Sequence, residues 1–127
     1  MHVNLVLSGG GARGFAHPGM IKALVELGFE PVAVSGTSAG AMAGAFIAAG
    51  YPPEEILELF IKNNFFKMVG GAFNKGLLNM DKIETFFRAS LPSDFSALRM
   101  PLSINATDIL TGSVVWFNSG ELVKPVL

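Results

Sequence analysis

The stretch that decides the fold is residues 3–40, VNLVLSGGGARGFAHPGMIKALVELGFEPVAVSGTSAG. It holds two short apolar runs, residues 3–7 and 31–35, and a glycine-rich turn follows each run. Apolar or small residues at helical spacing come after each turn, and Gly28 and Gly50 are placed to end the two helices. Strand, glycine turn and helix, twice in succession, predict right-handed βαβ units on a parallel sheet. The predicted fold class is α/β.

The remaining segments extend this pattern. Pro52 and Pro53 are expected to open a third helix, whose apolar face is formed by Ile56, Leu57, Phe60 and Ile61. Gly70 and Gly71 interrupt the pattern, and Asn79 is a plausible N-cap for a helix with one apolar stripe, made of Ile83, Phe86, Phe87 and Leu91. Residues 102–107 and 113–117 are predicted to form a strand hairpin at one end of the sheet.

Composition excludes several classes of protein. The chain of 127 residues is 50% hydrophobic and 15% charged, which fits a single domain over residues 1–127. A net charge of −1 gives no general attraction to nucleic acid, so no nucleic-acid partner is expected. The absence of cysteine and the presence of only 2 histidines argue against thiolate zinc sites and histidine-rich metal centres. Residues 1–7 lack the basic region of a secretory signal, so the expected location is cytoplasmic.

The second turn contains the motif G-x-S-x-G, formed by Gly36, Thr37, Ser38, Ala39 and Gly40. A nucleophile elbow places such a serine on a strained turn between a strand and a helix, where a side chain at either glycine would collide with its neighbours. Ser38 is therefore the predicted nucleophile. The Ala39 amide, at the positive end of the following helix, is available to a developing oxyanion. An ordinary glycine-rich turn is the alternative interpretation of the pentapeptide alone.

The first turn satisfies G-x-G-x-x-G through Gly9, Gly10, Gly11, Ala12, Arg13 and Gly14. This pattern raises a dinucleotide-binding module as a rival function. That function needs an acidic residue at the end of the second strand, but the nearest one, Glu30, lies at the strand's beginning. Consecutive glycines expose several backbone amides, which suit an oxyanion hole equally well. Both turns follow adjacent strands, so one pocket could contain both.

Together, the two glycine motifs in this order, with a weaker match at Ala106, Thr107 and Asp108, resemble the patatin-like phospholipase family. The resemblance implies a three-layer α/β/α lipid acyl hydrolase with a mainly parallel sheet and a Ser–Asp dyad. It implies a lipid or ester substrate, transient contact with a membrane surface, and neither metal nor cofactor. Ser38 would be the nucleophile, and the loop from Gly9 to Gly14 would supply oxyanion donors. Arg13 matches the basic position of that loop, or it is a surface residue that supports the turn.

The family's aspartate lies in a D-G-[GA] motif, which does not occur in this sequence. Asp81 is expected in the first turn of a helix and Asp94 in a loop or cap. Asp108 is expected to start a turn through an Asx hydrogen bond rather than to act as a base. We therefore expect the general base beyond Leu127, with residues 1–127 as the N-terminal portion of one hydrolase domain. A catalytically silent regulatory domain is the further alternative.

Two other features have a functional and a structural interpretation. His17 could serve Ser38 as a base, but a local packing or hydrogen-bonding role is favoured. An aromatic-rich stretch is interpreted mainly as core and alternatively as an apolar wall or lid for acyl chains, with Lys62 and Lys67 near a lipid surface. Its members are Phe60, Phe65, Phe66, Met68, Val69 and Phe73.

Overall fold

The structure is a computed structural model that describes residues 1–65 and 80–127. In chain order its elements are β1 (His2–Leu7), the 3-10 helix η1 (Gly11–Phe15), α1 (Ala16–Glu26), β2 (Glu30–Gly36), α2 (Ala39–Ala49), α3 (Pro53–Lys62), α6 (Met80–Ser90), the 3-10 helix η2 (Phe95–Ala97), β3 (Leu102–Thr107), β4 (Val114–Phe117) and α7 (Val123–Val126). The alternation of strands and helices confirms the predicted α/β class.

The sheet has the strand order β1-β2-β3-β4. The first three strands run parallel, with Leu7 opposite Gly36 and Gly36 opposite Ile104. The last pair is antiparallel, with Ile104 opposite Phe117. The hairpin predicted at one end of the sheet is therefore confirmed. The turns after β1 and β2 lie at the same edge of the sheet, since the carboxyl ends of adjacent parallel strands meet there.

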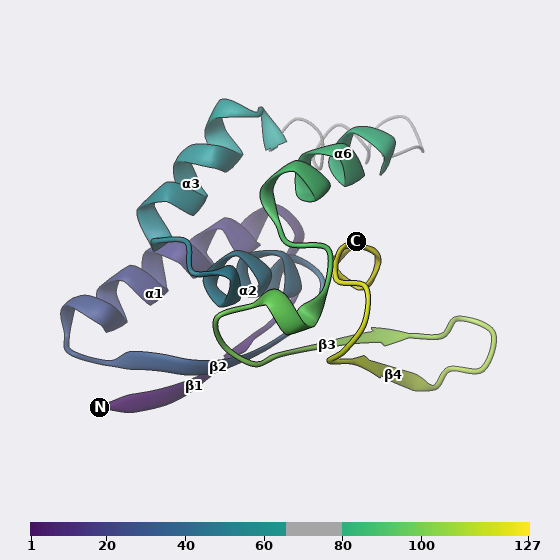
Figure 1. Ribbon diagram of the computed structural model, residues 1–127, viewed down its shortest axis with the longest axis horizontal. Coiled ribbons are helices and arrows are strands. Elements are labelled where there is room, and N and C mark those ends of the chain that lie inside the picture. The colour runs from purple at the N-terminus through teal and green to yellow at the C-terminus, as the bar shows by residue number, and fades with distance from the viewer. Residues whose placement is uncertain (66–79) are drawn as a thin grey trace.

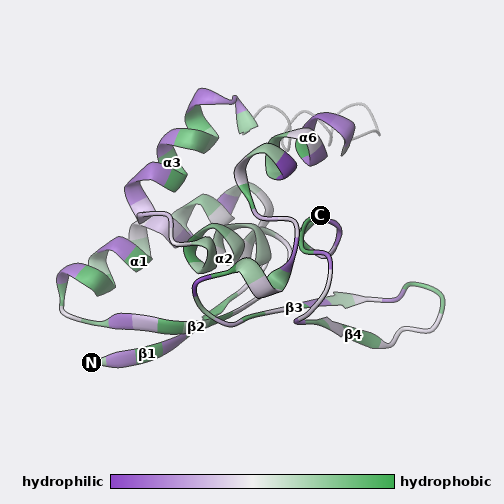
Figure 2. Cartoon of the chain, viewed as in Figure 1, coloured by the Kyte–Doolittle hydropathy of each residue, from purple (hydrophilic) through white to green (hydrophobic). Residues whose placement is uncertain are grey.

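The helices lie on one side of the sheet (Figure 1). Helix α2 lies against it and is apolar along its whole length (Figure 2), and most of its residues are buried. Its small residues allow this close approach: a Cβ added at Gly44 would lie 2.8 Å from Val34 Cγ1. Helices α3 and α6 cover α2 in turn, with Ile56, Phe60 and Phe87 in the core. The sheet therefore presents one buried face, and α2 fixes the turn that precedes it.

The opposite face of the sheet is more open. Val6 on β1 is 84% exposed and Trp116 on β4 is 60% exposed. The described residues thus supply the sheet and one helical layer of the expected α/β/α arrangement. Helix α7 lies on the covered side, where Val123 and Val126 are buried.

Local boundaries differ from the sequence expectation in a few places. The segment 11–15 forms η1 before α1 begins, and Pro18 falls within the first turn of α1, where proline is tolerated. The prediction that Ile61 belongs to the buried face of α3 is wrong, because its side chain is 57% exposed. Leu59 packs against the core instead. The helix breaker at Gly70 and Gly71 and the N-cap at Asn79 lie outside the described residues, as does the aromatic stretch beyond Phe65.

Candidate active site

Ser38 is located where β2 passes into α2. Its backbone has φ 51° and ψ −124°, a conformation that residues with a side chain rarely adopt. Such a residue costs about 1–3 kcal/mol and persists only where the surroundings enforce it. The surroundings here are Gly40 N–H, which donates to the Thr37 carbonyl at 2.9 Å, and Thr37 N–H, which donates to the Leu7 carbonyl at 3.2 Å. The turn is therefore tied both to itself and to the neighbouring strand.

The two glycines of the turn have no room for a side chain. A Cβ at Gly36 would lie 2.5 Å from the Gly40 carbonyl oxygen, and one at Gly40 would lie 2.2 Å from the Leu7 carbonyl oxygen. Both obstacles are backbone atoms, which cannot rotate away. The strand, the turn and the helix thus meet at van der Waals distance. Ser38 lies on this turn and is exposed.

Thr37 attaches the same turn to a distant strand. Its Oγ1 donates to the Asn105 carbonyl oxygen of β3 at 3.3 Å. The elbow is therefore held on both sides, by β1 through the Leu7 carbonyl and by β3 through Asn105. Such a hydrogen bond across the sheet has no signal in the local motif, which is why sequence reasoning did not assign Thr37 a separate role.

The glycine loop after β1 lies directly beside this turn. A Cβ at Gly9 would lie 3.4 Å from Ser38 Cβ, and a Cβ at Gly14 would lie 2.2 Å from Ala39 Cβ. Between them, Gly11 has a φ of 53°, and Arg13 N–H donates to the Gly10 carbonyl at 3.0 Å to close a helical turn. The exposed Arg13 side chain lies on the same loop. The structure thus brings the two sequence motifs together.

A pocket opens between the two motifs. Gly11, Gly14, Ser38 and Ala39 line one part of it. The side chains of Phe15, Met42, Phe60 and Phe65 line the rest. Ser38 carries the one polar side chain among the described residues that line this pocket. Sequence reasoning missed Phe15 and Met42 as pocket residues, although Met42 follows Ser38 by one helical turn and so shares its side of α2.

Two helices begin at residues that line this pocket. Ala39 is the first residue of α2, and the first amides of a helix have no acceptor within that helix. Gly11 likewise begins η1. The N-terminus of a helix adds a partial positive charge, which favours an anion near Ser38. These amides are the candidate donors for the oxyanion role expected from the sequence.

His17 makes a local hydrogen bond. Its Nε2 lies 2.9 Å from the Ser8 carbonyl oxygen, which can only accept, so this nitrogen is the donor. The ring therefore connects α1 to the start of the glycine loop, which confirms the expected local hydrogen bond.

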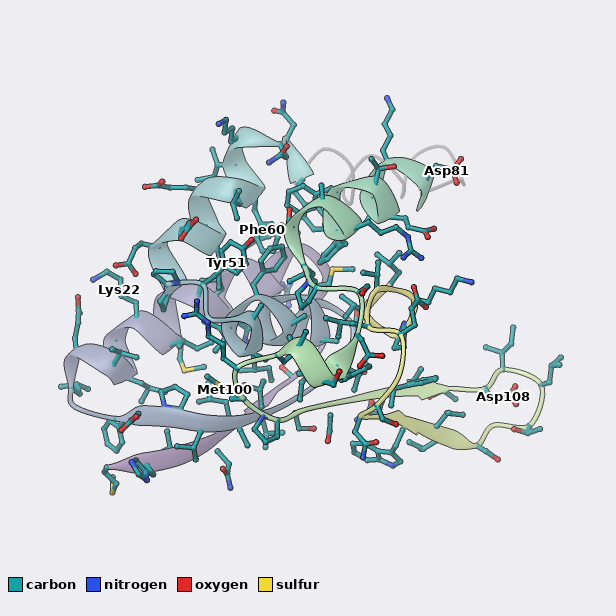
Figure 3. The ribbon with its side chains drawn as sticks, viewed as in Figure 1. Lys22, Tyr51, Phe60, Asp81, Met100 and Asp108 are labelled. Atoms are coloured by element: carbon teal, nitrogen blue, oxygen red, sulfur yellow. The ribbon has the colours of Figure 1, made fainter. Side chains whose placement is uncertain are left out.

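The aspartates of the chain are Asp81, Asp94 and Asp108. Asp94 accepts from Ser96 N–H at 2.8 Å and Asp108 from Leu110 N–H at 2.9 Å, which confirms the expected capping and Asx roles. The Ser96 hydrogen bonds lower the pKa of Asp94, and those from Leu110 and Thr111 lower the pKa of Asp108. Figure 3 shows Asp108 on the outer part of the hairpin and Asp81 at the start of α6, both well separated from Phe60 at the pocket.

Glu30, the acid considered for a nucleotide ribose, is the first residue of β2. It is exposed, and its Oε2 lies 3.1 Å from His2 Nε2. It therefore lies at the opposite end of the strand from Gly36 and from the pocket. None of the helices in the described ranges is long and apolar enough to cross a membrane.

Comparison with known proteins adds three observations. The patatin-like phospholipase family matches residues 5–113. An uncharacterized NTE family protein of Mycobacterium bovis is 36% identical over 124 residues, which cover 94% of this chain and 34% of that protein. A lysophospholipase of Aspergillus fumigatus is 56% identical over 46 residues, which cover 36% of this chain and 3% of that protein. The chain thus spans about a third of the length of the bacterial relative.

Two solved structures resemble the fold. The complex of ExoU and SpcU from the type III secretion system of Pseudomonas aeruginosa aligns with a TM-score of 0.68 and 21% identity, over 98% of this chain and 35% of that chain. VipD from Legionella pneumophila aligns with a TM-score of 0.63 and 19% identity, over 98% of this chain and 41% of that chain. At these identities the likeness concerns the fold.

Proposed function

The chain belongs to the patatin-like phospholipase family, and on this premise we propose that it acts in a serine hydrolase that cleaves lipid acyl esters. The observation that carries the proposal is Ser38, held at a φ of 51° on the β2–α2 turn at the edge of an apolar pocket. A strained serine between a strand and a helix is the arrangement of a nucleophile elbow. The pocket beside it suits the hydrocarbon part of a lipid.

The proposed reaction proceeds in two steps. Ser38 Oγ attacks the ester carbonyl as its proton passes to a general base, and the carbonyl oxygen becomes an oxyanion. The Ala39 amide and the amides of the loop from Gly9 to Gly14 donate to this oxyanion. The C–O bond to the alcohol then breaks, and the base returns the proton to the departing alcohol. Water adds to the acyl-enzyme by the same route and releases the fatty acid and Ser38.

The general base is proposed to lie outside residues 1–127, which would form the N-terminal portion of one hydrolase domain. Two observations support this. Asp94 and Asp108 are held in turns of their own, and the chain spans 34% of the bacterial relative's length. The exposed Val6 and Trp116 provide an apolar surface on which further polypeptide could pack. Residues 1–127 alone should then hydrolyse esters at least about 10⁴-fold more slowly than the intact protein. Equal rates would assign the base to this chain.

The substrate is proposed to be a lipid or simple ester reached by transient contact with a membrane surface. Phe60 lines the pocket, and two residues later the exposed Lys62 ends α3. An exposed lysine on the helix that contributes Phe60 to the pocket is favourable near anionic lipid. Binding to anionic vesicles that weakens with salt would support this part of the proposal.

The test of the nucleophile is covalent labelling of the intact protein with a fluorophosphonate probe, followed by identification of the labelled residue. Ser38→Ala should remove both the label and hydrolysis of a p-nitrophenyl ester. Ser119→Ala is the matched control, because Ser119 is exposed and lies after β4. Labelling that persists in Ser38→Ala would overturn the assignment. An unlabelled, inactive protein that binds a dinucleotide would favour the nucleotide-binding alternative, and one that binds none would favour a silent regulatory domain.

A further inference from the structure

The side chains that line the pocket beside Ser38 are almost all apolar. Apart from Ser38, the described side chains that line it are those of Phe15, Ala39, Met42, Phe60 and Phe65, all apolar. Its enclosed volume is about 50 Å³, well below the range of about 300–1,000 Å³ for small-molecule sites, and the rest of the hollow is open to solvent. Among these residues no side chain could bind a phosphate or a sugar. The part of an ester that fits here is therefore its hydrocarbon chain.

One wall of the pocket is built from packed aromatic rings. Phe60 and Phe65 stack with their centroids 4.9 Å apart, and the edge of Phe15 meets both rings at 5.4 and 5.9 Å. Phe46 supports Phe60 from the core at 5.4 Å. Phe60 is 3% exposed and Phe65 is 2% exposed, so neither can move aside without disturbing the core. This wall limits how far a chain can enter.

Met42 lines the same pocket as Ser38 and this wall. It follows Ser38 by four residues, which places it about 6 Å further along the helix. It is partly buried and packs against the core. An unbranched thioether adapts its shape to the group beside it. A chain that is attached at Ser38 and enters the pocket would therefore lie beside Met42 and Phe60.

We propose that this pocket binds the acyl chain of the ester, that it accepts short saturated chains, and that Met42 and Phe60 determine the longest chain accepted. The inference rests on the proposed function, since it takes Ser38 as the point where the acyl group is attached. It assigns the acyl chain to the α2–α3 side of Ser38 and leaves the alcohol or head group outside the pocket. Each methylene that enters should tighten binding about fourfold, the equivalent of about 0.8 kcal/mol, until the chain reaches the aromatic wall.

The experiment measures binding and turnover separately in the intact protein. Calorimetry with saturated fatty acids of increasing length, on the Ser38→Ala variant, reports the pocket without any catalytic step. Hydrolysis of p-nitrophenyl esters of the same acyl lengths by the wild type reports the reaction. We expect affinity and kcat/KM to rise with chain length and then to level off at the same length.

Two substitutions at Met42 test the assignment from both sides. Met42→Ala should move the levelling-off to longer chains, and Met42→Phe should move it to shorter ones. Phe60→Leu should also lengthen the accepted chain, and the Met42 pair keeps the test decisive if that core change unfolds the protein. Ile61→Ala is the matched control on α3, because Ile61 is 57% exposed and does not line the pocket.

The outcomes separate this inference from the proposed function. Hydrolysis with a length profile that both Met42 variants leave unchanged would overturn the pocket assignment and keep the hydrolase. Length-dependent binding that shifts in the Met42 variants, without hydrolysis or labelling at Ser38 in the wild type, would keep the pocket and overturn the hydrolase. Affinity that continues to rise with length well beyond the wild-type ester optimum would show that the aromatic wall does not limit the chain, and would also overturn the inference.

Discussion

The contact between the glycine loop and the elbow can be tested by adding a methyl group at Gly14 and removing the one at Ala39. A Cβ added at Gly14 would lie 2.2 Å from Ala39 Cβ, whereas carbon atoms in contact lie about 3.5–4.0 Å apart. Gly14→Ala must therefore separate the loop from α2 by about 1.5 Å. Overpacking of this kind costs about 1–3 kcal/mol. With a loss of about 4 °C per kcal/mol for a domain of this size, the melting temperature should fall by about 4–12 °C.

The compensating change is Ala39→Gly, which removes the methyl group that Gly14→Ala would strike. Without that methyl group, the nearest atoms to the new Cβ are Ala39 Cα at 3.4 Å and the Ala39 carbonyl carbon at 3.6 Å, both ordinary contacts. Ala39→Gly alone should cost at most about 1 kcal/mol through its lower helix propensity. The double variant should then be no less stable than Ala39→Gly, which corresponds to a coupling energy of about 1–3 kcal/mol.

The assays are thermal and urea unfolding followed by circular dichroism, together with ester hydrolysis. Misplacing the loop by more than about 1 Å from Ser38 should reduce turnover about 10²-fold in Gly14→Ala, with recovery in the double variant. If the stability losses of the two single variants simply add, the loop and the first turn of α2 are not in contact, and the proposed site loses its geometric basis.

The remaining predictions concern single positions. Gly10→Ala should fit without a clash, since the nearest atom to its Cβ is 3.6 Å away. It should nevertheless lower kcat about 10²–10³-fold, because it disturbs an oxyanion donor. A change in KM alone would show that the loop binds substrate rather than stabilising the oxyanion. Asp108→Asn should leave ester hydrolysis at neutral pH unchanged, and a large loss would make Asp108 the base. Because turn N–H groups lower the pKa of Asp108, its ionised form stabilises the fold above its unfolded pKa of about 3.9, and unfolding curves should show this contribution lost as pH falls through the lower folded value. Gly19→Ala in α1, where a Cβ meets nothing within 4 Å, should raise the free energy of unfolding by about 0.5–1 kcal/mol; destabilisation would refute the open space described there.

Much of the fold follows from local patterns. The apolar runs that became β1 and β2, the glycines that end α1 and α2, and the β3–β4 hairpin were all predictable, because each depends on residues close together in the chain. The position of Ser38 between a strand and a helix was predictable for the same reason. Where local patterns compete, prediction failed: Ile61 and Leu59 both fit an apolar face of α3, and packing against the core selected Leu59.

Amino-acid order alone thus determined the α/β class, the two glycine turns and the candidate nucleophile, since short-range sterics and hydrophobic periodicity encode each of them. Tertiary structure decided that Gly14 lies against Ala39, that Thr37 is tied to Asn105, and that Phe15, Met42 and Phe60 form one apolar pocket beside Ser38. These contacts join residues on different elements, far apart in the chain. Close packing of helices on the sheet creates them, so no local pattern of residues could specify them in advance.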